Sequence, residues 1–415
     1  MKRAALSKVH RAGIGKMFDF CRLDRDYLAS KKYCSDYGES GLRKITEVNA
    51  FEVAMSKVFS FCDEMGFSEQ GLLRAINKSL VDCRESPDSE RDLRVKTFEK
   101  NLEEVWVLRE YKIIKTYYGA TIKESDLPLR MGPFTIYDMP RHVGQIELDN
   151  LTTPQAHFPE GHESRTVIQY MATARDEVKA LEIANAAFNS LDLLVAFLLG
   201  DKYNQCSIGV LRMRWAPYQR ALISLSGGTW SQEEKNFNFM GSFEVTNLPS
   251  YYPGKVEADF YSLLAIVVSP SGELERKISR AVEWLGEAYT DANKSSAFLK
   301  AAVALEALLK LDEKSVITSS IMSTIAEQCA FINGKSVGEC LQVEVEVKEL
   351  YGVRSKIVHS GSKTISVKQL TEALELVRKT IINLVSIKVR LNLENIKGLQ
   401  LHIRNSRYAY CHATH

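Results

Sequence analysis

The sequence lacks the features that mark a secreted or membrane-spanning protein. Its first residues are basic but contain no continuous apolar core of a signal peptide, and no apolar run reaches the roughly 18 residues that a membrane helix needs. The longest run, LDLLVAFLLG at 191–200, is typical of the end of a buried helix. The eight cysteines never form a C-x-x-C pair, and a chain of this size needs no disulfides. We therefore expect reduced thiols, no membrane segment and a cytoplasmic location.

An excess of charge of one sign is also missing. The chain has 54 Lys and Arg against 52 Asp and Glu, so no broad basic surface is available to attract phosphate backbones. Complete motifs for nucleotides or zinc are absent too: AGIGKM at 12–17 follows no strand, and HFPEGHE at 157–163 lacks the i, i+4 histidine spacing of a zinc protease. Any nucleic-acid site must therefore be local, and we expect neither a metal nor a cofactor.

What is present is ordinary globular composition over a long chain. With 45% hydrophobic and 26% charged residues, the 415 residues exceed what one hydrophobic core usually organises. The changes in helical and strand periodicity along the chain predict an α+β protein, in which a mixed N-terminal and middle region is followed by an all-α helical bundle. The predicted divisions are an N-terminal region of unknown role at 1–125, an α/β region for sensing or substrate selection at 126–255, the bundle at 256–395 and a polar tail at 396–415.

The N-terminal and middle regions mix helical and strand signals. Periodicity predicts helices at 50–65 and 98–118, and RTVIQYMATA at 165–174 reads as a strand that runs into a long helix. That helix has Asp176 as its N-cap, and Gly200 ends it. Three further strands are predicted at 206–213, 220–228 and 237–248.

After about residue 256, helical periodicity takes over. Apolar stripes predict helices that include 274–289, 298–309, 317–332, 343–357 and 366–385. The segment VEVEVKE at 343–349 alternates like a strand, but its valines also fit a helical stripe and Ser336 begins a capping box upstream, so we favour a helix. The stripes predict a bundle. The polar tail offers no stripe on which a helix would pack.

One pair of residues in this bundle is chemically suggestive. Arg354 and His359 close a predicted helix, and Gly361 stands where a left-handed C-terminal cap would fall. In the last turn the helix dipole favours imidazolium, so a histidine there is suited to act as acid and base near neutral pH. The alternative is a capped helix end without catalysis. A second R-x4-H match, Arg407 with His412, lies in the polar tail and is treated as chance.

These residues resemble a known family. AVALEALLK at 302–310, followed about 40 residues later by LYGVRSKIVHSG at 350–361, is similar to the Apea-like branch of the HEPN superfamily, whose four-helix bundles carry an R-x4-6-H motif. The resemblance spans roughly residues 270–392, is looser over 130–250 and does not extend to the first hundred residues. It implies a metal-independent endoribonuclease that acts as a homodimer through the bundle in prokaryotic anti-phage defence or abortive infection, as a toxin. A phage-derived or cellular trigger would act at the N-terminal region.

The resemblance also implies roles for individual residues. His359 would be the general acid or base as the ribose 2'-hydroxyl attacks the adjacent phosphate, leaving a 2',3'-cyclic phosphate and a 5'-hydroxyl, and Arg354 would stabilise the charge that develops. Glu306 would orient one of the two, unless it forms only a structural salt bridge. Supporting roles, in phosphate binding or orientation, fall to Ser355, Lys356 and Ser360. The alternative function is a catalytically inactive HEPN module that regulates a partner protein.

Five residues along one helix also set the direction of the two side chains. At roughly 100° per residue, Arg354 and His359 point about 140° apart, which aims them poorly at one phosphate. A two-fold axis that brings two such helix ends together would assemble both pairs around one cleft. The geometry therefore favours the dimer that the resemblance implies.

Overall fold

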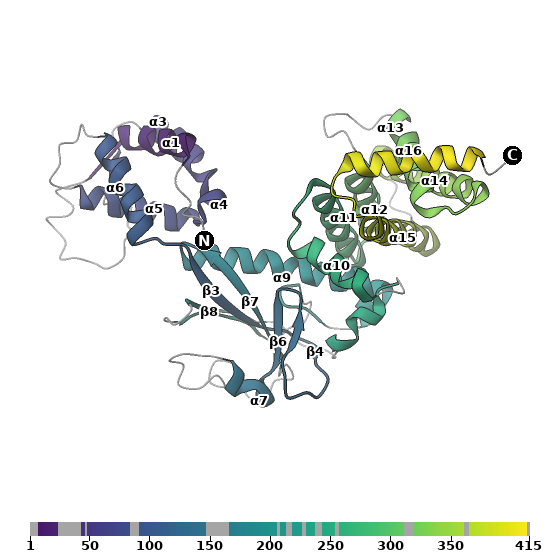
Figure 1. The fold of residues 1–415 in the computed structure, drawn as a ribbon, viewed down its shortest axis with the longest axis horizontal. Coiled ribbons are helices and arrows are strands. Elements are labelled where there is room, and N and C mark those ends of the chain that lie inside the picture. Colours follow the sequence, from purple (N-terminus) through teal and green to yellow (C-terminus); the bar gives the residue numbers. More distant parts are fainter. Residues whose placement is uncertain are drawn as a thin grey trace.

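A computed structural model describes twelve stretches of the chain and no others. They are residues 7–23, 43–45, 48–83, 91–146, 166–205, 208–212, 218–225, 230–236, 243–253, 257–310, 319–360 and 365–412. Within them the protein is α+β, as predicted, with an N-terminal helical unit, a central antiparallel sheet and a C-terminal helical bundle (Figure 1).

The N-terminal helical unit has its own hydrophobic core. Its helices are α1 (Lys8–Asp19), α3 (Val48–Phe59), α4 (Cys62–Met65), α5 (Glu69–Asp82) and α6 (Arg91–Glu104), beside a short ribbon of β1 (Cys21–Leu23) and β2 (Arg43–Ile45). Ser7 and Ser68 cap α1 and α5 with their side chains. Fully buried Met17, Phe67 and Phe98 lie at the centre, so this unit encloses a core separate from that of the rest of the molecule.

The central sheet has six antiparallel strands in the order β5-β6-β7-β3-β8-β9. The strands are β3 (Arg109–Thr116), β5 (Leu129–Met131), β6 (Phe134–Asp138), β7 (Thr166–Ala174), β8 (Tyr218–Leu225) and β9 (Trp230–Asn236). A separate parallel pair joins β4 (Ala120–Thr121) to β10 (Phe243–Glu244), and short helical turns α7 (Met139–His142), η2 (Val143–Gln145), η3 (Gly200–Gln205) and η4 (Val245–Tyr251) complete the region. Alternate residues of β3 and β7, such as Ile113 and Ile168, face the main core.

Helix α9 (Glu177–Leu199) covers one face of this sheet and continues into the bundle (Figure 1). Asp176 is its N-cap and Gly200 its C-cap, as the sequence predicts. Together with η3 it is the one helix of the described residues that is long and apolar enough to cross a membrane. However, 72% of its most apolar window is buried inside the molecule, which is typical of a core helix.

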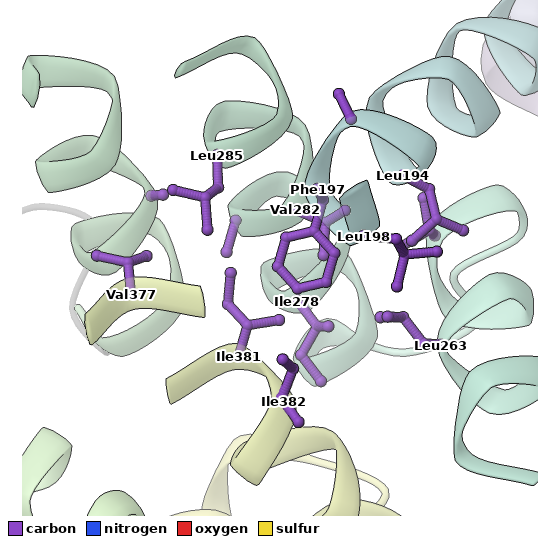
Figure 2. Packing of buried hydrophobic residues seen from close by; sticks show 14 of the residues in the cluster. Leu194, Phe197, Leu198, Leu263, Ile278, Val282, Leu285, Val377, Ile381 and Ile382 are labelled. Atoms are coloured by element: carbon purple, nitrogen blue, oxygen red, sulfur yellow. The ribbon is translucent and has the colours of Figure 1, made fainter. Parts of the chain in front are cut away.

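The bundle consists of seven helices that pack against one another. They are α10 (Glu257–Val268), α11 (Glu273–Thr290), α12 (Lys294–Leu309), α13 (Ser319–Asn333), α14 (Val337–Ser360), α15 (Val367–Leu391) and α16 (Ile396–His412). Helices α10 and α11 also pack against α9. Figure 2 shows how Phe197 and Leu198 of α9 interlock with Ile278 of α11 and Ile381 of α15. One continuous core therefore runs from the sheet through α9 into the bundle.

The structure corrects four sequence predictions. Of the helix predicted at 98–118, only the first residues belong to a helix, α6, which ends at Glu104. Residues 109–116 instead form strand β3, because this apolar run pairs with β7 on one side and β8 on the other. The described part of 206–213 forms a single bridge at Gly209, and the described part of 237–248 contains two strand residues followed by the 3-10 helix η4. The polar tail is largely helix α16, in which Leu399 and Ile403 are buried against the bundle.

A partly buried carboxylate, Glu275, joins α11 to α15 and gives a pH-dependent prediction. Glu275 accepts hydrogen bonds from the backbone N–H and hydroxyl of Ser271, and its Oε1 lies 2.9 Å from Nζ of Lys388. Burial raises the pKa of Glu275, but these hydrogen bonds outweigh it and lower the pKa to about 2. Because the folded-state pKa lies below the unfolded one, the contribution to stability is present above about pH 4.5 and is lost as the pH falls towards 2.

We expect Glu275→Gln to lower the free energy of unfolding by about 2 kcal/mol at pH 6 and by much less at pH 3. Urea unfolding of parent and variant at both pH values measures the difference. The matched control is Glu273→Gln, at an exposed position on the same helix. Its free energy of unfolding should differ little from that of the parent at either pH. An equal loss at pH 6 and pH 3 for Glu275→Gln would show that the charge of this carboxylate is not what Ser271 and Lys388 stabilise.

Candidate functional site

The helix that carries Arg354 and His359 is α14, which is 24 residues long. Val343, Val347 and Leu350 are all buried on one face, so the helical interpretation of the alternating segment is confirmed. Ser336 caps the helix by accepting a hydrogen bond from the N–H of Glu339 at 3.3 Å. The Glu339 carboxylate in turn accepts a hydrogen bond from the backbone N–H of Lys335. His359 lies in the last turn, one residue before the end of the helix.

Arg354 forms an ion pair with Glu306 of α12. Its Nε lies 3.0 Å from Oε1 of Glu306, and the two side chains are 24% and 13% exposed. These two atoms do not have the angles of a directed hydrogen bond, so the contact is electrostatic. The structure therefore brings together two residues that lie 48 positions apart in the sequence, at the distance that direct orientation of the guanidinium requires.

The surroundings of this pair are weakly polar. Burial raises the pKa of Glu306, and the positive charge of Arg354 opposes that rise. Tyr351, which is 4% exposed, has a hydroxyl pKa raised first by burial and then by the negative charge of Glu306. Where the effective dielectric constant is low, the attraction between the two charges is stronger than in water. Glu306 therefore restrains the position of Arg354 more than it would at the surface.

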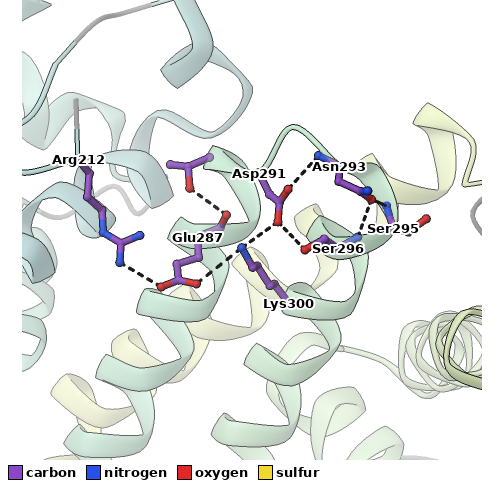
Figure 3. A network of polar contacts seen from close by, with 8 residues as sticks. Arg212, Glu287, Asp291, Asn293, Ser295, Ser296 and Lys300 are labelled. Carbon is purple, nitrogen blue, oxygen red and sulfur yellow. Dashed lines mark hydrogen bonds and ion pairs between the residues drawn. The ribbon is translucent and has the colours of Figure 1, made fainter. Parts of the chain in front are cut away.

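The start of helix α12, which carries Glu306, is held in place by a polar network (Figure 3). Lys300 of α12 lies 2.8 Å from Asp291 and 3.7 Å from Glu287, both at the end of α11. Glu287 also pairs with Arg212 at 3.1 Å, and Arg212 belongs to the segment between η3 and β8. Lys300, six residues before Glu306, therefore connects α12 to the end of α11 and, through Glu287, to Arg212 of the central region.

The remaining predicted site residues point elsewhere. Ser355 and His359 are exposed, and they lie about 100° and 140° around α14 from Arg354. Lys356 is exposed and lines a cleft on a third face of the helix. The side chain of Ser360 and all of Gly361 lie outside the described residues. A single chain thus joins Arg354 to Glu306 but does not bring His359 to them.

No pattern in the sequence predicted the cleft between α14 and α15. It has a volume of about 670 Å³, and Phe298 of α12 lies among its apolar lining residues. Four glutamates line it, from α14 (Glu346 and Glu349) and from α15 (Glu372 and Glu375). The i, i+3 glutamate pairs are visible in the sequence, but only the tertiary arrangement shows that they share one cleft. Next to so many carboxylates, Lys356 is poorly placed to bind phosphate.

The other sequence fragments add no further site. Within the described part of the chain, no group of three or more His, Cys, Asp and Glu side chains is arranged to hold a metal ion. HFPEGHE at 157–163 lies outside the described residues. Arg407 of the second R-x4-H match pairs with Glu327 of α13 and fixes α16 to the bundle. No protein-family model, curated protein or solved structure matches the chain.

Proposed function

We propose that the protein is a metal-independent endoribonuclease that cuts RNA through Arg354 and His359. The observation that carries this proposal is the half-buried ion pair between Arg354 and Glu306, with an exposed histidine five residues further along the same helix. A guanidinium held by a carboxylate keeps a fixed positive charge near the surface, which is what a developing phosphorane needs. An exposed imidazole in the last turn of a helix is accessible to a ribose hydroxyl and to a leaving oxygen.

The proposed chemistry needs only these side chains. One histidine takes the proton of the ribose 2'-hydroxyl as the oxygen attacks phosphorus, and the protonated His359 of a second copy of the chain donates a proton to the 5' oxygen as its bond to phosphorus breaks. The products are a 2',3'-cyclic phosphate and a 5'-hydroxyl. Arg354 neutralises the non-bridging oxygens, and Glu306 keeps the guanidinium in position.

A second copy of the chain would complete the site. The face of α14 that carries His359 also exposes Val337, Leu341 and Val345, which are 45%, 59% and 47% exposed. These residues follow the i, i+4 spacing of a helix that packs against another helix. A two-fold axis along this face would bring two copies of His359 together, with each Arg354 about 140° around its own helix and held by Glu306.

The testing experiment is cleavage of total cellular RNA by the purified chain in EDTA, with and without infected-cell lysate, followed by identification of the RNA ends. We expect cyclic phosphates from the parent, a loss of at least a hundredfold in His359→Ala and Arg354→Ala, and a smaller loss in Glu306→Gln. Arg407→Ala is the matched control from the second motif and should cut like the parent. Leu341→Glu should reduce dimer formation and cleavage together.

Two results would sink the proposal: no cleavage by the parent under either condition, or cleavage by the histidine and arginine variants at the parental rate. The protein would then be better described as a binding module that regulates a partner, the second candidate. The acidic cleft beside α14 favours that candidate independently, because a cleft of this size and charge is unsuited to RNA.

A further inference from the structure

The groove between α14 and α15 is an unfilled position in the bundle. Both helices pack on α12 and on α13, and the space between them is the cleft of about 670 Å³. Its apolar lining includes Phe298, Leu350 and Leu376, which are 1%, 4% and 8% exposed. Packed helices normally close such a space at an interaxial distance of about 8–10 Å.

The groove runs lengthwise along both helices. Its lining residues run from Gln342 to Lys356 along α14 and from Gln369 to Lys379 along α15. At 1.5 Å per residue these stretches are about 21 and 15 Å long. The space beside Gly352 on one wall is open, since a Cβ built there would meet nothing within 4 Å. The two walls are therefore about as long as three to four turns of a helix.

The walls select for positive charge. Four glutamates face two lysines, Lys356 and Lys379, which leaves the groove with an excess of negative charge. The ion pair of Glu372 with Lys368 at 3.7 Å stays within α15. Phosphate backbones are repelled by this surface, whereas lysine or arginine side chains on the flanks of an apolar helix face would meet the carboxylates.

We infer that the groove binds a basic amphipathic helix of a partner protein. The apolar face of that helix, with anchors at i, i+3 or i+4 and i+7, lies on the apolar lining, and its flanking lysines or arginines meet the glutamates. The proposed dimer face with Leu341 and Val345 lies roughly 90° around α14 from the groove axis. A second copy of the chain bound to that face would therefore not occupy the groove. Binding itself does not depend on RNA cleavage, although a bound helix would lie beside Lys356 and thus three residues from His359.

The test is selection of binders from a phage-displayed library of helical peptides, using the full-length chain as the target. The selected peptides are then synthesised and titrated by fluorescence anisotropy against parent and variants. We expect cationic amphipathic sequences whose dissociation constants rise at least tenfold in the double variant Glu349→Gln/Glu375→Gln and at least fivefold in Gly352→Leu. The matched control, Glu344→Gln, removes a carboxylate of α14 outside the groove and should change binding less than twofold.

Hydrogen exchange locates the peptide. Protection of backbone amides at 346–356 and 369–379 on peptide addition is the expected result. Several outcomes overturn the inference: no enrichment, selected peptides without net positive charge, or equal binding to the double variant. The same holds if no basic peptide binds and the double variant instead abolishes self-association, which would make a second copy the occupant.

Discussion

Replacing Gly286 by alanine is expected to lower the free energy of unfolding by about 2–3 kcal/mol, although alanine favours helices over glycine by about 1 kcal/mol. Gly286 lies on α11 where this helix crosses α9. A Cβ at this position would lie 2.4 Å from the carbonyl oxygen of Leu193 and 3.0 Å from its Cα. Both atoms belong to the backbone, so relief requires that α9 and α11 move apart and that the core shown in Figure 2 loosens.

Urea unfolding followed by circular dichroism measures this effect, and Gly338→Ala supplies the control. Gly338 lies in the first turn of α14, where an added Cβ meets nothing within 4 Å. The control should be as stable as the parent or slightly more stable. If Gly286→Ala behaved like the control, the close approach of α9 and α11 would be wrong.

Arg175→Ala is expected to weaken the attachment of the N-terminal helical unit by about 3 kcal/mol. Arg175 is 8% exposed at the junction between β7 and α9. Its guanidinium donates to the carbonyl oxygens of Met65 at 2.8 Å and Leu102 at 2.9 Å, and also to that of Trp106. Removing it leaves three carbonyl groups without this donor, each worth about 1 kcal/mol. Burial lowers the pKa of Arg175, consistent with its enclosed position.

Hydrogen exchange and limited proteolysis report this attachment separately from the stability of the bundle. We expect faster exchange and cleavage around residues 62–68 and 102–106 in Arg175→Ala, with the bundle unchanged. Arg175→Lys should recover little, because an ammonium group cannot reproduce the planar fork of donors. The control is Arg109→Ala. Arg109 is exposed and lies opposite Ala174 in the sheet, so its replacement should not change exchange or cleavage. If Arg175→Ala and Arg109→Ala showed the same exchange and cleavage rates at residues 62–68 and 102–106, Arg175 would not be what holds the N-terminal helical unit.

The success of sequence-based prediction here depended on whether the relevant burial is local. Amphipathic stripes such as Leu274 to Tyr289 gave the bundle helices, because a helix turns its own periodic residues to the core. The apolar run at 109–116 gave the wrong element, since a short apolar segment fits a helix or a central strand until its neighbours are known. The tail helix was missed because few apolar residues, among them Leu399 and Ile403, hold it.

The candidate site divides in the same way. A charge at Glu306 in an apolar stretch predicted a partner, and Arg354 lies 3.0 Å from it. The same reasoning could not show that Lys356 shares a cleft with glutamates of α15, because that depends on how α14 and α15 both pack on α12. Whether Arg354 and His359 perform chemistry remains a prediction for the cleavage experiment.

Helix α9 determines where this chain can be cut for expression. It belongs to the sheet at its start and to the bundle at its end, where the carbonyl of Leu198 accepts a hydrogen bond from Arg378 of α15. A fragment that begins at α10 would lose Phe197 and Leu198 and would present Ile278 and Val282 to water. Such a fragment has the exposed apolar patch that leads to aggregation. Expression of the C-terminal part should therefore start before β3, so that the sheet keeps the strand that joins β7 to β8 and α9 remains attached to both layers it covers.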